Sequence, residues 1–129
     1  MAHRWQSLNL YNNMKKFEVD AKNQALGRIA SRIAIILRGK NSPDFDPSRV
    51  SAHIVTVKNL AEAKFTGKKF EDKVYHHYSG FHGGLKTRNL SNLWAKSPEN
   101  VLRHMVYRML PKNRIREIMI KNLKFEGQK

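Results

Sequence analysis

The chain has 129 residues and a mass of 15.0 kDa, which suits one domain with a hydrophobic core and excludes two domains of ordinary size. Its 25 Lys and Arg residues against 10 Asp and Glu give a net charge of +15, an excess that predicts a polyanionic partner. The chain contains no cysteine, which excludes disulfides, thiolate metal sites and a thiol nucleophile and is compatible with a reducing cytoplasm.

The positive charge is spread along the chain rather than gathered in a basic tail. The net charge is +6 over residues 1–64, +3 over 65–100 and +6 over 101–129, so several faces are expected to meet phosphate at once. The first residues lack the apolar stretch of a secretory signal, and no run approaches the roughly 18 apolar residues of a membrane-spanning helix. We therefore expect no membrane partner.

The first part of the chain predicts a flexible arm, a strand and a helix. Residues 1–16 are polar and without periodicity, which predicts an arm ahead of a single domain over 17–129. Apolar and polar residues alternate over 17–21, as is typical of a short strand. The helix that follows has the clearest pattern in the chain, and Gly39 is a natural stop for it. Its apolar stripe comprises Leu26, Ile29, Ala30, Ile33, Ala34, Ile36 and Leu37.

A proline-containing loop over residues 41–48 separates this helix from a β-branched strand over 52–57. A strand, a helix and a strand in this order predict a parallel pair joined by a right-handed crossover. The first strand-to-helix turn contains only Gly27, so neither dinucleotide nor NTP binding is indicated. One short helical turn is expected over 60–64.

Residues 65–88 combine cations, aromatic rings and glycines more densely than any other stretch. They hold four of the seven glycines and three of the six histidines. Glycines allow the backbone to approach a phosphate, cations neutralise that phosphate, and flat rings can stack on bases. We interpret this stretch as a surface for RNA. Thr66 is expected to cap a short helix there, followed by a strand over 73–79, a glycine turn and a return strand over 85–88.

The last third of the chain predicts three helices and a strand. A short helix over 91–96 carries Trp94, which we interpret as a core anchor. Ser97 and Pro98 are a strong helix start, and Pro111 should end that helix. Its apolar face comprises Val101, Leu102, Met105, Val106, Met109 and Leu110. The next helix is expected to begin near Lys112, with a last strand over 123–126. In that helix Ile115, Ile118, Met119 and Ile120 should point inward, and Arg114, Arg116 and Lys121 outward.

No motif in the sequence indicates catalysis or metal binding. The six histidines are dispersed, and the neighbours His76 and His77 would point to opposite faces of a strand. A nuclease would want paired carboxylates, for which only the adjacent Glu71 and Asp72 stand out, and these more simply cap a helix or pair with lysines. We expect no enzyme activity, no metal, no cofactor and no small-molecule substrate.

Several sequence blocks, in order from about residue 17 to residue 125, resemble the ribosomal protein L13 family (uL13) in its bacterial form. The blocks are Asp20-Ala21, Leu-Gly-Arg-Ile-Ala-Ser31, Leu-Arg-Gly-Lys40, Thr-Gly-Lys-Lys-Phe-Glu-Asp-Lys-Val-Tyr75, Ser-Gly-Phe-His-Gly-Gly-Leu-Lys86, Pro-Glu-Asn-Val-Leu102 and Met-Leu-Pro-Lys-Asn-Arg114. The chain departs from the family at Arg116, where a glycine is usual.

The resemblance implies a fold, a role and partners. The fold would be a three-layer α/β/α domain with a small, mostly parallel central sheet, and without enzymatic activity. The role would be that of a constituent of the large ribosomal subunit, in the ribosome and cytoplasmic, which binds large-subunit rRNA, supports early assembly and contacts neighbouring large-subunit ribosomal proteins. Family members have also been linked to mRNA binding and translational control.

The residues expected to contact RNA fall into groups with different roles. Phosphate contacts are expected from Lys68, Lys69 and Lys73, with further cations at Arg28, Arg32, Arg38, Lys40, Lys86 and Arg88. Aromatic and polar contacts are expected from Tyr75, His76 and Tyr78, and close approach at Gly83 and Gly84. A second patch, at a helix N-terminus, comprises Lys112, Asn113 and Arg114.

Two alternatives stay open at this point. A free regulatory module that binds RNA or DNA would show the same charge, and sedimentation with or apart from large subunits separates it from a ribosomal protein. A nuclease would show metal-dependent cleavage that is lost when Glu71 and Asp72 are replaced by alanine.

Overall fold

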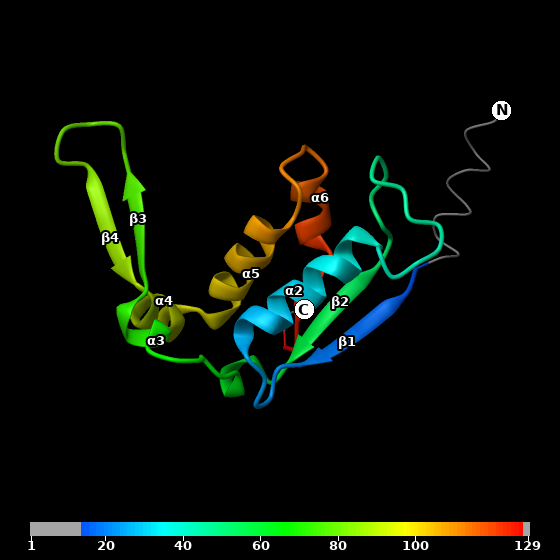
Figure 1. The fold of residues 1–129 in the computed structure, drawn as a ribbon, viewed down its shortest axis with the longest axis horizontal. Helices are drawn as coiled ribbons and strands as arrows, with labels where there is room; N and C mark the ends of the chain where they lie inside the picture. Colours follow the sequence, from blue (N-terminus) through cyan, green and yellow to red (C-terminus); the bar gives the residue numbers. More distant parts are fainter. Residues whose placement is uncertain (1–13, 128–129) are drawn as a thin grey trace.

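The computed structural model describes residues 14–127, so the arm expected over residues 1–16 lies almost wholly outside the described residues. Its last residue, Lys16, begins strand β1 (Lys16–Asp20). This strand pairs in parallel with β2 (Ile54–Lys58), which pairs in parallel with β5 (Leu123–Phe125). The order β1-β2-β5 puts the most β-branched strand in the centre of the sheet, and the predicted α/β class with a small parallel sheet is confirmed (Figure 1).

The register of the sheet separates a buried face from a polar one. Val55 lies opposite Leu123, and Val57 lies opposite Phe125 and Val19. All five side chains are buried. The alternate residues point the other way, and there Lys58 Nζ lies 2.7 Å from Glu18 Oε2. The core therefore sits on one face of the sheet, as the period-2 alternation of the strands requires.

Helix α2 (Leu26–Arg38) covers the buried face, and it begins and ends where the sequence predicts. Six of the seven stripe residues are buried, and the seventh, Ile36, is half-buried. Gly39 ends the helix in the left-handed conformation with φ 78°, and its N–H donates to the carbonyls of Ile35 and Ile36. This is the glycine C-cap that the sequence indicated.

Helix α5 (Pro98–Met109) packs against α2 and starts as predicted. The Ser97 hydroxyl oxygen accepts a hydrogen bond from the Asn100 N–H at 3.4 Å, and Pro98 occupies the first turn, where its missing N–H costs nothing. Val101, Leu102 and Val106 are buried, and the helix stops two residues before Pro111.

Helix α6 (Arg116–Lys121) begins later than the expected start near Lys112. The Asn113 side-chain oxygen accepts from the Arg116 N–H at 3.0 Å and so satisfies the first helical turn. In so short a helix Met119 is the one buried residue, and Ile118 is 52% exposed rather than inward. The outward position expected for Arg116 is wrong as well, because its guanidinium carbon lies 3.9 Å from the centre of the Tyr107 ring and the side chain is half-buried.

Residues 60–96 pack against α5 at their base and carry a projecting hairpin. Short helices η1 (Leu60–Glu62), α3 (Lys69–Asp72) and α4 (Leu90–Lys96) form its base. Strands β3 (Val74–Tyr78) and β4 (Leu85–Asn89) pair antiparallel and stand away from the rest of the molecule (Figure 1). Trp94 is half-buried and lies edge-on to the Phe65 ring at 4.9 Å, which agrees with its interpretation as an anchor.

The expected Thr66 cap of α3 is wrong. The helix is preceded by Lys68, and no side chain caps it. Gly67, at φ 67°, turns the chain between Thr66 and the helix, and the threonine lies two residues before the N-cap position, Lys68.

Candidate nucleic-acid interface

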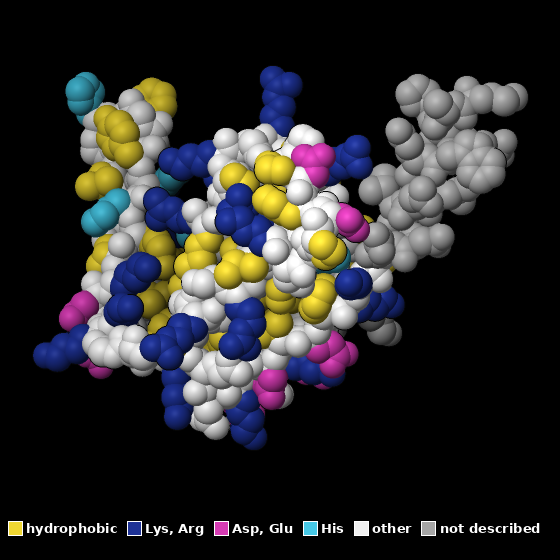
Figure 2. All heavy atoms as spheres, turned by 45° about the vertical axis from the view of Figure 1, so that its right-hand side comes forward, with side chains coloured by type: hydrophobic (Ala, Val, Ile, Leu, Met, Phe, Trp, Pro, Cys, Tyr) yellow, Lys and Arg dark blue, Asp and Glu magenta, His cyan; other side chains and the backbone are white. Residues whose placement is uncertain are grey.

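A groove of about 690 Å³ lies between the base of the hairpin and the first turn of α2. Its cations are Arg28, Lys64, Lys68, Lys69 and Lys73, and Asp72 is its single acidic residue. Its apolar lining includes Leu26, Phe65, Leu90 and Met105. Figure 2 shows Lys and Arg side chains beside the hollow between the hairpin and the body. The groove therefore combines a positive edge with an apolar floor.

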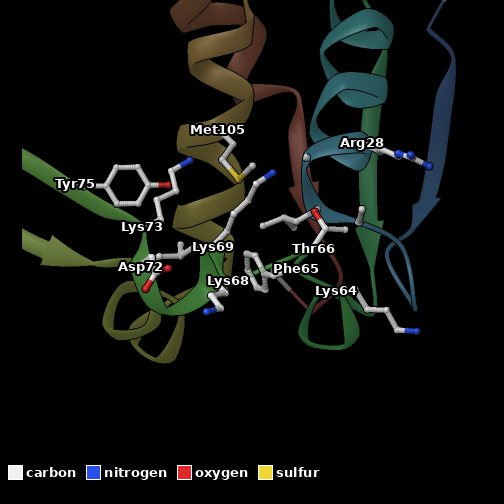
Figure 3. Close-up of a pocket in the computed structure, with 14 residues that line it drawn as sticks. Arg28, Lys64, Phe65, Thr66, Lys68, Lys69, Asp72, Lys73, Tyr75 and Met105 are labelled. Carbon is white, nitrogen blue, oxygen red and sulfur yellow. The ribbon is translucent and has the colours of Figure 1, made fainter.

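Two backbone hydrogen bonds fix one wall of the groove. The Lys64 N–H donates to the Gln24 carbonyl at 2.9 Å, and the Leu26 N–H donates back to the Lys64 carbonyl at 3.0 Å. These bonds pair residue 64 with the chain just before α2, as a short parallel bridge between Ala25 and Lys64. Because α2 starts at that bridge, Lys64 and Arg28 lie on the same side of the groove (Figure 3).

Helix α3 and the start of β3 form the other wall. The Leu90 N–H donates to the Lys73 carbonyl at 2.9 Å, which closes the base of the hairpin. Lys73 Nζ lies 5.3 Å from the centre of the Tyr75 ring. In Figure 3, Lys69 extends across the groove toward Met105, whereas Lys68 points outward.

In the described part of the chain, the groove has five cations and one acidic residue, Asp72. Within residues 14–127, ion pairs join Lys22 to Glu62, Arg49 to Asp46 and Lys58 to Glu18. None of these pairs uses a cation of the groove. The positive charge at the groove is therefore available to a negatively charged ligand.

The positive charge at the groove affects the pKa of the neighbouring His104. Its ring lies edge-on to Tyr75 at 5.8 Å. Partial burial lowers the pKa of His104, and the positive charges of Arg108 and Lys73 lower it further. Arg108, which the sequence analysis did not select, thus adds to the charge of the wall that carries Lys73.

The two faces of the hairpin differ in charge. Tyr75 pairs with Arg88, and His77 pairs with Lys86, so these four side chains share one face. The opposite face has no Lys, Arg, Asp or Glu; its residues are Val74, His76, Tyr78, Leu85, Thr87 and Asn89. The predicted contacts therefore split between the faces, with Tyr75, Lys86 and Arg88 on one and His76 and Tyr78 on the other. His77, which is not among the predicted contact residues, lies on the same face as Tyr75.

The backbone conformation at the tip of the hairpin explains why glycine occupies positions 83 and 84. Gly83 has φ 70°, a conformation that side chains rarely adopt. A Cβ at Gly84 would collide with the Ser79 hydroxyl and lie 3.0 Å from the Phe81 carbonyl oxygen. The turn itself therefore requires both glycines, and their close approach to RNA stays a prediction. Phe81 at the tip is 78% exposed.

The remaining predicted residues lie on α2 and at its far end. Arg32 is exposed one turn after Arg28, and Lys40 is exposed just past Gly39. Arg38 lies 6.0 Å from the centre of the Phe45 ring and lines a small cavity of about 70 Å³ with Asn113. The three residues expected at a helix N-terminus precede α6 instead; Lys112, Asn113 and Arg114 lie in the exposed turn before it. They are close to the end of α2 rather than to the groove.

Within residues 14–127 two further kinds of functional feature are absent. No three His, Asp or Glu side chains in this range lie close enough together to hold a metal ion. No helix in this range is long and apolar enough to span a membrane.

Comparison with known proteins identifies the family. The ribosomal protein L13 family matches residues 14–129, which is most of the chain. The chain belongs to this family. The predicted resemblance to bacterial L13 proteins is thereby confirmed. The L13 family is structural and non-enzymatic, so the chain is not an enzyme and the nuclease alternative is set aside.

Three bacterial relatives illustrate the similarity, and each is described as large ribosomal subunit protein uL13. The protein of Lawsonia intracellularis is 47% identical over 124 residues, covering 96% of this chain and 78% of the relative. That of Geobacter sulfurreducens is 46% identical over 106 residues, covering 82% and 74%. That of Deinococcus radiodurans is 46% identical over 106 residues, covering 82% of this chain and 61% of the relative.

Proposed function

We propose that this L13-family chain is a structural constituent of the large ribosomal subunit, in the cytoplasmic ribosome, and that it binds large-subunit rRNA. The observation that carries the proposal is the groove, where five cations surround one opening and the ion pairs found within residues 14–127 use other cations. Cations left unpaired by the fold are the expected mark of a phosphate-binding surface.

The proposed mechanism is neutralisation of phosphates on more than one side of the protein. One contact surface comprises the groove and the charged hairpin face, with Arg28, Lys68, Lys69, Lys73, Tyr75, Lys86 and Arg88. The hairpin's other face and tip add His76, Tyr78, Gly83 and Gly84. A second surface combines the exposed side and end of α2 with the turn before α6, through Arg32, Arg38, Lys40, Lys112, Asn113 and Arg114. A protein that bridges two RNA segments neutralises phosphates on both and so reduces the repulsion between them. This effect would support early assembly of the subunit.

Neighbouring ribosomal proteins are the second class of partner in this proposal. On the charge-free face of the hairpin Leu85 is 60% and Val74 is 36% exposed, and because neither is a proposed RNA contact, these apolar side chains favour contacts with protein. The comparisons give no support to mRNA binding, and it is not part of the proposal.

The binding test measures affinity for large-subunit rRNA at several salt concentrations. Replacing both Lys68 and Lys69 with alanine should flatten the slope of log affinity against log salt by about 1.4–1.8, since each phosphate contact contributes roughly 0.7–0.9. The matched control replaces Lys58 and Lys124, which also lowers the charge by two but lies on the face of the sheet opposite α2. An unchanged slope in the first variant, or an equal change in both, would contradict the assignment of the groove.

Sedimentation of cell extracts tests the ribosomal role separately. The protein should be found with large subunits at moderate salt. A mainly free pool would favour the regulatory alternative instead.

A further inference from the structure

The floor of the groove is apolar, which phosphate binding alone does not explain. Leu26 and Leu90 are 2% exposed at its base, and the half-buried Phe65 and Met105 lie above them. In Figure 3 the Phe65 ring and the Met105 thioether both lie in the middle of the opening. A ligand made only of phosphate would leave this apolar surface facing water.

Three of the five cations lie at the edge of the groove, whereas Lys69 extends across it toward Met105. In Figure 3, Arg28, Lys64 and Lys68 point outward from the edge. A ligand that matches this arrangement has an apolar, flat part that enters the groove and negative charges that stay at its mouth. From these two observations we infer that the groove receives one unpaired nucleotide, with its base on Phe65 and Met105 and its flanking phosphates on the edge cations.

This inference rests on the proposed function, and the competing ligands fit the groove less well. An RNA duplex keeps its bases stacked inside the helix, so it would contact the edge cations and leave the floor uncovered. A peptide from another basic protein would be repelled by five cations and one acid. A nucleotide turned out of its stack supplies both the flat base and the adjacent phosphates.

The size of the groove and its neighbouring rings agree with this ligand. A volume of about 690 Å³ falls within the range of small-ligand pockets, which roughly spans 300–1,000 Å³, and a duplex cannot enter such a space. Tyr75 lines the same groove, and Lys73 Nζ lies 5.3 Å from its ring centre. An extruded base would therefore meet an aromatic ring and a cation on the hairpin side.

The test measures the affinity of the whole chain for two RNA stems that differ by a single unpaired nucleotide. That nucleotide is the fluorescent base analogue 2-aminopurine. The stem with the unpaired nucleotide should bind about tenfold tighter than the fully paired stem, and the 2-aminopurine emission should change on binding. Met105→Gln keeps the length of the side chain and makes the floor polar, so it should abolish the tenfold preference and keep the affinity for the paired stem.

Met109→Gln is the matched control, because Met109 lies one turn further along the same helix, is 43% exposed and does not line the groove. It should keep the preference. Equal binding of the two stems by a chain that still binds large-subunit rRNA would overturn the nucleotide assignment and leave the proposed function intact. Tighter binding of a glutamate-rich peptide than of either stem, lost in Met105→Gln, would assign the groove to an acidic protein segment and also overturn it.

Discussion

Gly39 offers a sharp test of how the end of α2 is held. Its φ of 78° is in the left-handed region, where an alanine costs about 1–2 kcal/mol. An alanine Cβ there would also lie 3.0 Å from Ser51 Cβ and 3.1 Å from Ser51 Oγ, closer than ordinary van der Waals contact. The alanine also reduces the conformational entropy of the unfolded chain, which offsets the destabilisation by about 0.4–1 kcal/mol. We therefore expect Gly39→Ala to lower the free energy of unfolding by about 1–2 kcal/mol.

Gly27, in the first turn of the same helix, is the matched control. A Cβ at Gly27 meets nothing within 4 Å, and its φ lies outside the left-handed region. Gly27→Ala should therefore raise the free energy of unfolding by about 0.5–1 kcal/mol through helix propensity. The two variants make the same chemical change in one helix and should shift stability in opposite directions.

Urea unfolding followed by far-UV circular dichroism measures both variants. Gly39→Asn should fall between wild type and Gly39→Ala, because asparagine tolerates the left-handed region better than alanine does. If Gly39→Ala is as stable as wild type, or if both alanine variants shift stability in the same direction, the account of this helix end is wrong.

Two further predictions concern the hairpin and the histidines. Replacing Lys86 and Arg88 with glutamine should weaken RNA binding and flatten its salt dependence, whereas replacing Lys58 and Lys124 with glutamine, which removes the same charge from the sheet face opposite α2, should leave both nearly unchanged in the same titration. The pKa values of His53 and His104 are lowered in the fold from 6.5, for both chiefly by burial. The unfolded chain thus binds more protons, so their contribution to stability is present above pH 6.5 and is lost as the pH falls through the folded pKa values. Urea unfolding should show this decline in wild type and a flatter profile when both histidines are replaced by glutamine.

The sequence predicted those elements whose signals are local. The stripe of α2 and its glycine stop, and the Ser97-Pro98 start of α5, are patterns that one helix contains by itself. The start of α6 was misplaced because Pro111 ends one helix without specifying where the next begins. That choice depends on the Asn113 side chain, which bonds the Arg116 N–H.

The groove could not be predicted, because it depends on contacts between distant parts of the chain. Lys64 follows an unremarkable helical turn in the sequence, and only its backbone bonds to Gln24 and Leu26 bring it beside Arg28. Met105 read as one more residue of a core stripe, yet it is half-buried and lines the opening. A single sequence does not reveal that such positions line a groove, because neither spacing nor composition indicates which loop will form hydrogen bonds with which helix.

The separation of charge on the hairpin follows from the register of its strands. Shifting β4 by one residue against β3 would place Thr87 opposite Tyr75 and move both Lys86 and Arg88 to the other face. The positive face would then point away from the residues that Tyr75 contacts, His104 and Lys73. The turn that fixes this register is built on Gly83 and Gly84, whose positions a side chain cannot take without strain or collision. The glycines therefore determine which strand face carries Lys86 and Arg88 beside Tyr75.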